Sequence, residues 1–192
     1  MSERVRNLTP EVLSDNWYVL RKFTYDYQRR DGSWSQQTRE AYDRGNGVVI
    51  LLYNRQRHSV VLTRQFRLPA YVNEHDGMLI EACAGLLDKD DPEAAIKRET
   101  EEETGYRLEK VTKVFEAFMS PGSVTERLYF YVAEYDADSK VSSSGGLEDE
   151  GEDIEVLELD FDAAMRMIDT GEIMDGKTIM LLQHAKIHQL LD

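Results

Sequence analysis

The sequence feature that most constrains this chain is one segment that carries both a start and a stop signal for a helix. Asp90 or Asp91 can accept hydrogen bonds from the N–H groups of a first helical turn. Pro92 suits the first helical position, where its missing N–H needs no partner, and Gly105 suits the left-handed residue that ends a helix. We therefore expect a short helix over residues 92–104.

Three carboxylates gather on one face of this helix. Glu99, Glu102 and Glu103 stand at positions i, i+3 and i+4, which lie on the same side within about one turn. Like charges at this spacing repel each other, and a hard divalent cation with oxygen ligands would offset that repulsion. The alternative is an ordinary solvated face, because the chain contains 37 acidic residues.

The residues around the helix favour a binding site over a solvated face. Arg98 precedes the first of the three carboxylates and can orient a neighbouring one. The run from Met78 to Ala84 is apolar and typical of a strand, so we expect it to be buried, with a loop from Ala84 to the helix. An acidic helix face beside the end of a buried strand indicates a site.

The length and charge of the chain exclude several classes of function. Its 192 residues can bury one core with a small appendage. The net charge of −14 argues against binding to nucleic-acid backbones or anionic membranes, both of which require basic patches. The single cysteine, Cys83, cannot form an internal disulfide, and we expect it in the core. No apolar signal region or run of about 20 apolar residues is visible, so we expect a cytoplasmic protein.

The first forty or so residues are predicted to form a separate unit. Two runs rich in strand formers, at residues 17–20 and 23–27, precede a turn signal and a returning strand over residues 34–42. Such a hairpin or small antiparallel sheet is marginal alone, so its apolar face should pack on the main domain or on a second subunit. A glycine-rich break then suggests an N-terminal β-sheet region over residues 1–44 and a main domain over residues 45–192.

The main domain is predicted to be a mixed sheet between helices, because strands and helices follow one another without a strict βαβ repeat. Asp160 can cap a helix over residues 161–170 that Gly171 ends. A last helix is expected over residues 178–191, with its Met and Leu side chains in the core. The expected strands are residues 48–53, 60–66, 111–118, 128–135 and 154–159.

The acidic helix resembles the Nudix box, in which Gly, five residues, Glu and seven residues precede Arg-Glu, an aliphatic, any residue, Glu-Glu, any residue, Gly and an aliphatic. Arg98-Glu99, Glu102-Glu103 and Gly105 match this pattern. The departures are a segment one residue short after Gly85, Asp90 in place of Glu, and Thr100 and Tyr106 in aliphatic positions. The resemblance covers most of the chain and implies the α/β/α sandwich of Nudix proteins, with the small N-terminal antiparallel sheet added.

The resemblance also implies a magnesium site, with Mn²⁺ as a possible substitute. In similar enzymes a loop far downstream of the box supplies a glutamate that reaches the metal and acts as a base. Here the acidic cluster over residues 148–153 occupies that place, with Glu152 as the first candidate and Glu150 as the second, although a solvated loop is the simpler interpretation. The implied catalytic residues are Glu152, Glu103 and Arg98, and the implied metal ligands are Ala84, Glu99, Glu102, Glu103 and Glu152.

Within the family, the chain looks most like the GDP-mannose pyrophosphatases of the ADP-ribose pyrophosphatase-like group. That likeness rests on residues 13–16, 42–47, 64–67 and 175–178, and it implies hydrolysis of GDP-mannose to GMP and mannose 1-phosphate. It also implies a homodimer that exchanges the N-terminal sheet, so that residues near Trp17 and Arg39 serve the partner's site. The implied substrate-binding residues are Trp17, Arg39, Glu40, Arg67, Gly85, Leu86, Glu126 and Lys177.

Several alternatives stay open. ADP-ribose or another nucleoside diphosphate sugar can be the substrate, because the box handles only the diphosphate, and a binding module that senses the nucleotide sugar without turnover is a rival of another class. Residues 171–178 match the letters of a P-loop, but a predicted helix precedes them where a P-loop needs a strand. Lys177 there is expected to be an exposed lysine at a helix start. His184 and His188 lack an evident third ligand for zinc.

Overall fold

The computed structural model describes residues 3–87, 91–143, 145–146 and 153–192. Backbone contacts divide the chain into two units, each of which is described by itself. The first comprises residues 1–46 together with 118–127, and the second comprises residues 47–117 and 128–192. Two segments far apart in the sequence therefore make up the smaller unit.

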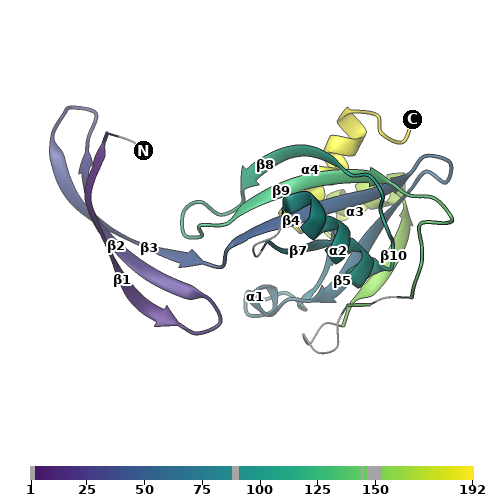
Figure 1. Ribbon diagram of the computed structural model, residues 1–192, viewed down its shortest axis with the longest axis horizontal. Helices are drawn as coiled ribbons and strands as arrows, with labels where there is room; N and C mark the ends of the chain where they lie inside the picture. Colours follow the sequence, from purple (N-terminus) through teal and green to yellow (C-terminus); the bar gives the residue numbers. More distant parts are fainter. Residues whose placement is uncertain (1–2, 88–90, 144, 147–152) are drawn as a thin grey trace. The chain divides into compact units, whose positions relative to one another are not determined.

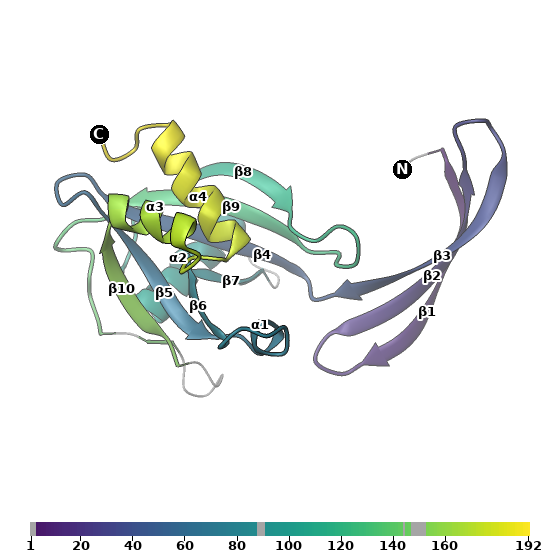
Figure 2. The same cartoon turned by 180° about the vertical axis from the view of Figure 1, so that it is seen from behind.

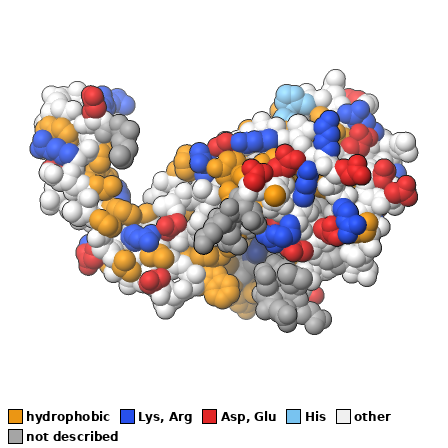
Figure 3. Space-filling view, viewed as in Figure 1, with side chains coloured by type: hydrophobic (Ala, Val, Ile, Leu, Met, Phe, Trp, Pro, Cys, Tyr) orange, Lys and Arg blue, Asp and Glu red, His pale blue; other side chains and the backbone are white. Residues whose placement is uncertain are grey.

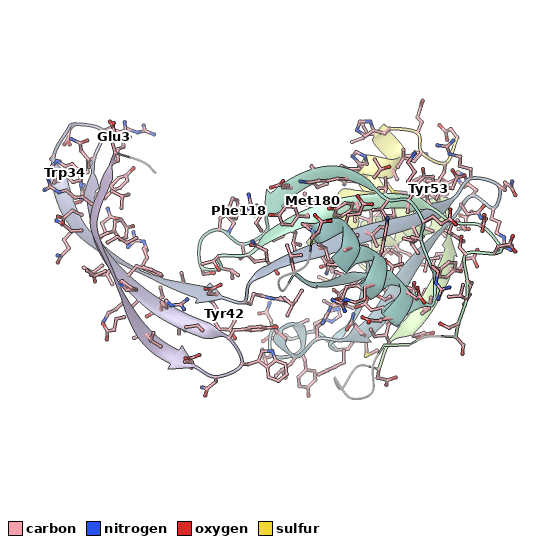
Figure 4. All side chains as sticks on the ribbon, viewed as in Figure 1. Glu3, Trp34, Tyr42, Tyr53, Phe118 and Met180 are labelled. Carbon is pink, nitrogen blue, oxygen red and sulfur yellow. The ribbon has the colours of Figure 1, made fainter. Side chains whose placement is uncertain are left out.

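The smaller unit is an antiparallel sheet of three strands in the order β1 (Val5–Asp15), β2 (Val19–Gln28) and β3 (Trp34–Asp43). Figure 4 shows Trp34 at one end of this long sheet and Tyr42 at the other. The turn between β2 and β3 forms because Asp31 accepts hydrogen bonds from the N–H and the hydroxyl of Ser33. None of the described side chains of these strands is fully buried, so the sheet has no core of its own.

A loop over residues 118–127 belongs to this unit because its backbone pairs with the end of β3. The N–H of Tyr42 donates to the carbonyl of Ser123 at 2.8 Å, and the N–H of Thr125 donates to the carbonyl of Tyr42 at 3.0 Å. Together they form a short parallel bridge between Tyr42 and Val124. This bridge fixes the loop that leads to Glu126.

The larger unit is built on a seven-stranded mixed sheet in the order β10-β5-β4-β9-β8, with β6 paired to β5 and β7 paired to β4. Strands β4 and β9 are parallel, whereas β5 is antiparallel to β4, β6 and β10. The strands are β4 (Asn46–Asn54), β5 (Ser59–Phe66), β6 (Met78–Glu81), β7 (Ala84–Leu87), β8 (Thr112–Phe118), β9 (Arg127–Glu134) and β10 (Glu155–Asp160). Asn46 and Phe118–Arg127, at the ends of β4, β8 and β9, fall in the smaller unit.

Helices cover both faces of this sheet, as Figures 1 and 2 show from opposite sides. Helix α2 (Pro92–Thr104) lies on one face, and α3 (Phe161–Thr170) and α4 (Gly176–Ile187) lie on the other, while α1 (Leu68–Tyr71) is a single turn after β5. The central strand β4 is a continuous apolar run because both of its faces are covered, and residues 48–52 are completely buried. The predicted fold class, an α/β sandwich with a mixed sheet and a small antiparallel sheet, is confirmed.

Three sequence predictions need correction. The run over residues 78–84 is not one buried strand: it splits into β6 and β7, Met78 is exposed, and Glu81 is one of its buried side chains. The segment 84–87, predicted to be a loop, is strand β7. The last helix begins at Gly176, two residues earlier than expected, because Asp175 caps it by accepting from the N–H of Thr178, and it ends at Ile187, four residues earlier than expected. Strand β1 was not predicted.

No helix in the described part of the chain is long and apolar enough to cross a bilayer.

Candidate active site

Helix α2 begins and ends where the sequence predicts. Asp91 caps it, since its Oδ2 accepts hydrogen bonds from the N–H groups of Glu93 at 3.0 Å and Ala94 at 3.4 Å. Gly105 ends it with φ of 76°, and its N–H donates to the carbonyl of Glu101. Asp90, the other predicted cap, lies outside the described residues. The caps fix the ends of α2, and the face that it buries carries Ala95, Ile96, Thr100, Glu103 and Thr104.

Arg98 holds two of the three predicted carboxylates. Its Nη2 lies 2.8 Å from Oε1 of Glu99, and its Nη1 donates to Oε2 of Glu102 at 2.8 Å. One guanidinium therefore offsets part of the repulsion between these glutamates, which was predicted to be offset by a divalent cation. The orientation of both carboxylates depends on Arg98.

Glu99 and Glu103 lie against consecutive residues of strand β7. The side chain of Glu103 is almost completely buried, and its Oε2 accepts a hydrogen bond from the N–H of Ala84 at 3.3 Å. The carboxyl group of Glu99 occupies the space beside Gly85, because a Cβ built on that glycine would lie 2.1 Å from Cδ of Glu99. The lack of a side chain at Gly85 is what allows Glu99 to approach β7 so closely.

Cys83 packs beneath these carboxylates and belongs to the core, as predicted. Burial raises the pKa of the Cys83 thiol well above its usual value, and the charge of Glu103 and a hydrogen bond to it raise the pKa further. A thiol held in its protonated form is not a nucleophile. The chemistry of this site therefore rests on carboxylates.

A second cluster joins residues that are distant in the sequence. Arg67 follows β5 and donates from Nε to Oε1 of Glu81 at 2.7 Å and from Nη2 to Oε2 at 3.2 Å. Lys177, at the start of α4, forms an ion pair with the same Oε2 and a second one with Asp175 at 2.9 Å. Only 3% of the Glu81 side chain is exposed, so this is a buried ion pair with two cations on one carboxylate.

The charges in this cluster keep one another ionised. Burial alone would raise the pKa of Glu81, but the charge of Lys177 and the hydrogen bonds from Arg67 outweigh burial and lower the pKa. Burial likewise acts to lower the pKa of Lys177, but Glu81 and Asp175 outweigh it and raise the pKa. At neutral pH both groups are therefore charged.

Thr178 fastens the same end of α4 to the sheet. Its hydroxyl accepts a hydrogen bond from the N–H of Ala82 at 2.6 Å and donates to Oδ2 of Asp175 at 2.5 Å. Lys177 is thus not the exposed lysine that the sequence suggested: 14% of its side chain is exposed, because Glu81 and Asp175 hold it. Glu81 was not predicted to belong to the site, although an acidic residue in an otherwise apolar run was a signal that could have pointed to it.

The remaining predicted residues lie in several places. Leu86 is on β7, and Trp17 precedes β2 with 83% of its side chain exposed. Arg39 and Glu40 are exposed on β3. Glu126 is largely buried in the smaller unit, where its carboxylate lies 3.4 Å from Nε of Arg44. Glu152 and Glu150 lie outside the described residues.

Two alternatives raised by the sequence receive no support. Residues 171–178 follow helix α3, not a strand, as predicted, so they do not form a P-loop. The rings of His184 and His188 lie 4.2 Å apart, and among the described residues no group of three His, Cys, Asp or Glu side chains is arranged to hold a metal ion.

Comparisons with known proteins agree with this geometry. The family model for the NUDIX domain matches residues 43–182, and the model for the GDP-mannose pyrophosphatase NudK N-terminal domain matches residues 4–42. The chain belongs to the Nudix family. It is similar to proteins named GDP-mannose pyrophosphatase from three bacteria: Yersinia pestis, 58% identical over 98% of this chain and 94% of the relative; Yersinia enterocolitica, 57% over all of both; and Pectobacterium atrosepticum, 55% over 97% and 96%.

Nudix hydrolases generally use divalent metal ions, and the carboxylates of α2 fit such an ion in the type of their donor atoms. In this structure Glu99 and Glu102 bind Arg98 and Glu103 accepts from the N–H of Ala84, so the three are not arranged around one point, and holding an ion would require their side chains to turn. Glu99, Glu102 and Glu103 are hard oxygen donors of the type that Mg²⁺, Mn²⁺ and Ca²⁺ prefer. Gly85 leaves open the space in which Glu99 lies beside β7, and any larger residue there would fill it.

Proposed function

We propose that this chain is a Mg²⁺-dependent Nudix hydrolase that cleaves the diphosphate of GDP-mannose to give GMP and mannose 1-phosphate. The observation that carries the proposal is that carboxylates and phosphate-binding cations meet at one short stretch of sheet. Glu103 accepts from Ala84 at the start of β7, and Glu81, three residues earlier, binds Arg67 and Lys177. The names of relatives that match nearly the whole chain support GDP-mannose as the substrate.

Glu99, Glu103 and Glu102, with the carbonyl group of Ala84, would hold the ion, and Mn²⁺ can substitute because it accepts the same donors. When bound, the ion would neutralise the charge of the diphosphate and lower the pKa of a coordinated water. Arg98 would keep Glu99 and Glu102 in the orientation described above. Gly85 and Leu86 on β7 would contact the substrate through their backbone groups.

The protein's own residues would perform the phosphoryl transfer by positioning and charge. Arg67 and Lys177 would bind phosphate oxygens, since guanidinium and ammonium groups both donate charge-assisted hydrogen bonds to them. A water molecule would attack one phosphorus in line with the leaving oxygen, and Glu152 would take its proton. Glu150 is the second candidate for this base.

Four residues of the smaller unit would complete substrate binding. Trp17, with its indole exposed, would stack on the guanine base, and Arg39 would bind phosphate with Glu40 beside it. Glu126 would accept a hydrogen bond from a ribose or sugar hydroxyl. The N-terminal region over residues 1–44 would thus serve specificity, and the Nudix domain over residues 45–192 would serve chemistry.

The smaller unit would also make the protein a homodimer. Its three strands expose large apolar side chains and bury none of the described ones, and Figure 3 shows hydrophobic side chains along this sheet. A second copy of the sheet would cover that apolar surface, and its Trp17 and Arg39 would then serve the neighbouring site. The exposed residues are Val5, Leu8, Val12, Leu13, Trp17, Trp34 and Tyr42. A monomeric mass at working concentration, measured by light scattering, would refute this.

Product analysis tests the proposed function. The purified protein is incubated with GDP-mannose, ADP-ribose, GDP-glucose, UDP-glucose and NADH, with Mg²⁺ and with chelator, and products are identified by mass. GDP-mannose cleaved best to GMP and mannose 1-phosphate, only with metal, is the expected result. Preference for ADP-ribose would leave the site intact and overturn the base and sugar assignment. No turnover of any compound would favour a sensor that binds nucleotide sugars.

A further inference from the structure

Glu81 is the centre of an arrangement that the proposed mechanism uses but does not explain. Arg67 and Lys177 stand 110 positions apart in the sequence and on different elements. Both bind the carboxylate of Glu81, and Nη2 of Arg67 and Nζ of Lys177 share its Oε2. A buried acid that draws two cations to one oxygen has to be accounted for, because burying a charge is costly unless its partners are well placed.

The hydrogen bonds of both cations leave donors for a ligand. Of the five N–H donors of Arg67, two point to Glu81, and the described residues accept none of the other three. Lys177 has three donors and, among the described residues, its hydrogen bonds go to Glu81 and Asp175, which leaves one. About 40% of the Arg67 side chain is exposed, so a ligand can approach it from solvent while two of its N–H donors are held by Glu81.

The end of α4 that carries Lys177 is held independently. The hydroxyl of Thr178 links the N–H of Ala82 to Asp175, and Ala82 is adjacent to Glu81. The backbone around both Lys177 and Glu81 is therefore fixed by bonds that do not involve the Glu81 carboxylate. Loss of that carboxylate alone would change the direction of two side chains and leave the position of α4 in place.

We infer that Glu81 is a positioning residue that holds Arg67 and Lys177 together so that their remaining donors act on one phosphate group of the substrate. This inference rests on the proposed function, since it assigns a common ligand to two residues of that site. Glu81 itself does not contact the substrate. Because its charge is neutralised by the two cations it holds, it shapes the site without repelling the diphosphate.

The test replaces Glu81 by glutamine, which keeps the shape and removes the charge. With GDP-mannose as substrate, the KM of Glu81→Gln is expected to rise by about 10-fold or more, because each unfixed cation loses its geometry. Glu81→Asp keeps the charge and is expected to recover part of the loss. A fall in KM would overturn the inference, since it would mean that Glu81 competes with the phosphate for the cations.

A pH profile separates positioning from a general loss of structure. In Glu81→Gln, Lys177 keeps only Asp175 as an acidic partner beside the charge of Arg67, while its burial remains, so its pKa should fall. We expect kcat/KM of this variant to decline at alkaline pH at which the wild type stays constant. Identical alkaline limbs in both proteins would contradict a role through Lys177.

The matched control is Glu158→Gln, which removes an acid that also pairs with an arginine, Arg57 at 3.0 Å, but on β10 and away from the proposed site residues. This variant should keep the wild-type KM. If Glu81→Gln does not fold, Lys177→Met is compared with the wild type by calorimetric titration of GDP. Equal GDP affinity of the two proteins would overturn the inference. The wild type could also fail to cleave GDP-mannose and still bind GDP more tightly than Lys177→Met. That result would refute the proposed function and leave the joint action of Arg67 and Lys177 on a phosphate intact.

Discussion

Replacing Gly85 by alanine would force Glu99 away from the strand that it lies against. The new Cβ would stand 2.1 Å from Cδ and 2.4 Å from Oε2 of Glu99. Carbon atoms in good contact are about 3.5 Å apart, so the carboxylate has to retreat by about 1.4 Å. The backbone at Gly85 does not have the positive φ that disfavours alanine, and Glu99 is a flexible side chain, so the fold should tolerate the change.

A displacement of the Glu99 carboxylate by this distance should lower the catalytic rate strongly and the stability of the fold only slightly. Moving a catalytic group by about 1 Å can cost about 100-fold in rate, so we expect kcat for GDP-mannose to fall by about that factor. The Mg²⁺ concentration for half-maximal rate should rise as well, because Glu99 is a proposed ligand. The thermal midpoint should change by only a few degrees, as for about 1 kcal/mol or less.

The assay is a set of Mg²⁺ titrations at saturating GDP-mannose, with the thermal midpoint measured on the same samples. Gly122→Ala serves as the stability control, because a Cβ at that position meets no atom within 4 Å. Unchanged kcat and unchanged Mg²⁺ dependence in folded Gly85→Ala would refute the reasoning. It would show that the place of Glu99 beside β7 does not matter for turnover.

Three further predictions concern single residues. Glu103→Gln should fold, because an amide oxygen can still accept the backbone hydrogen bond, yet lose orders of magnitude in turnover; equal turnover would remove Glu103 from the mechanism. Gly105→Ala should lose about 1–2 kcal/mol of unfolding free energy in urea, because the residue has φ of 76° and a new Cβ would lie 2.3 Å from the carbonyl oxygen of Ser142. Gly171→Ala, with φ of 80° and no neighbour within 4 Å, should lose less. Equal losses in the two variants would show that the contact with Ser142 does not contribute. Because the pKa of Glu81 is lowered in the folded state, the stability that its ionised form contributes is present above its unfolded pKa and is lost as the pH falls through its folded pKa. The excess free energy of unfolding of the wild type over Glu81→Gln should therefore shrink on acidification, and an excess that does not shrink would contradict this.

Helix α2 was predictable because its signals are local. Asp91 and Gly105 act within one turn of the helix that they begin and end, so the sequence alone places both caps. The central strand β4 was predictable for a related reason, since a strand covered on both faces is apolar at every position. The family resemblance implied roles for Glu99 and Glu103 but not their contacts with β7.

Strand β1 was not predicted because almost none of its residues is buried, so its sequence shows no pattern of apolar residues. Ten of its eleven residues are exposed, including polar and apolar ones, and Pro10 interrupts it, so neither alternation nor an apolar run marks a strand. Its pairing with β2 over the register from Val5 to Asp15 is what defines it. When neither face of a sheet is covered, backbone pairing between its strands places no constraint on the side chains, and the sequence does not reveal it.

Glu81 escaped prediction because its partners are distant in the sequence. Arg67 is 14 residues away and Lys177 is 96 residues away, so no local spacing connects them. Without partners, an acid in an apolar strand suggests an exposed position, and the structure shows the opposite. The same distance explains the error at Lys177, whose exposure depends on Glu81 and on the bond from Thr178 to Ala82.

The pairing of Tyr42 with the loop over residues 118–127 bears on how this family can diversify. A recombination event that exchanged only the first 46 residues between two relatives would carry Asp43 and Arg44 but leave behind Thr125 and Glu126, whose side chains bind them. Inheritance of a new N-terminal module would therefore require matching changes some eighty positions downstream. Hybrid chains made for specificity engineering should transplant both segments as one cassette.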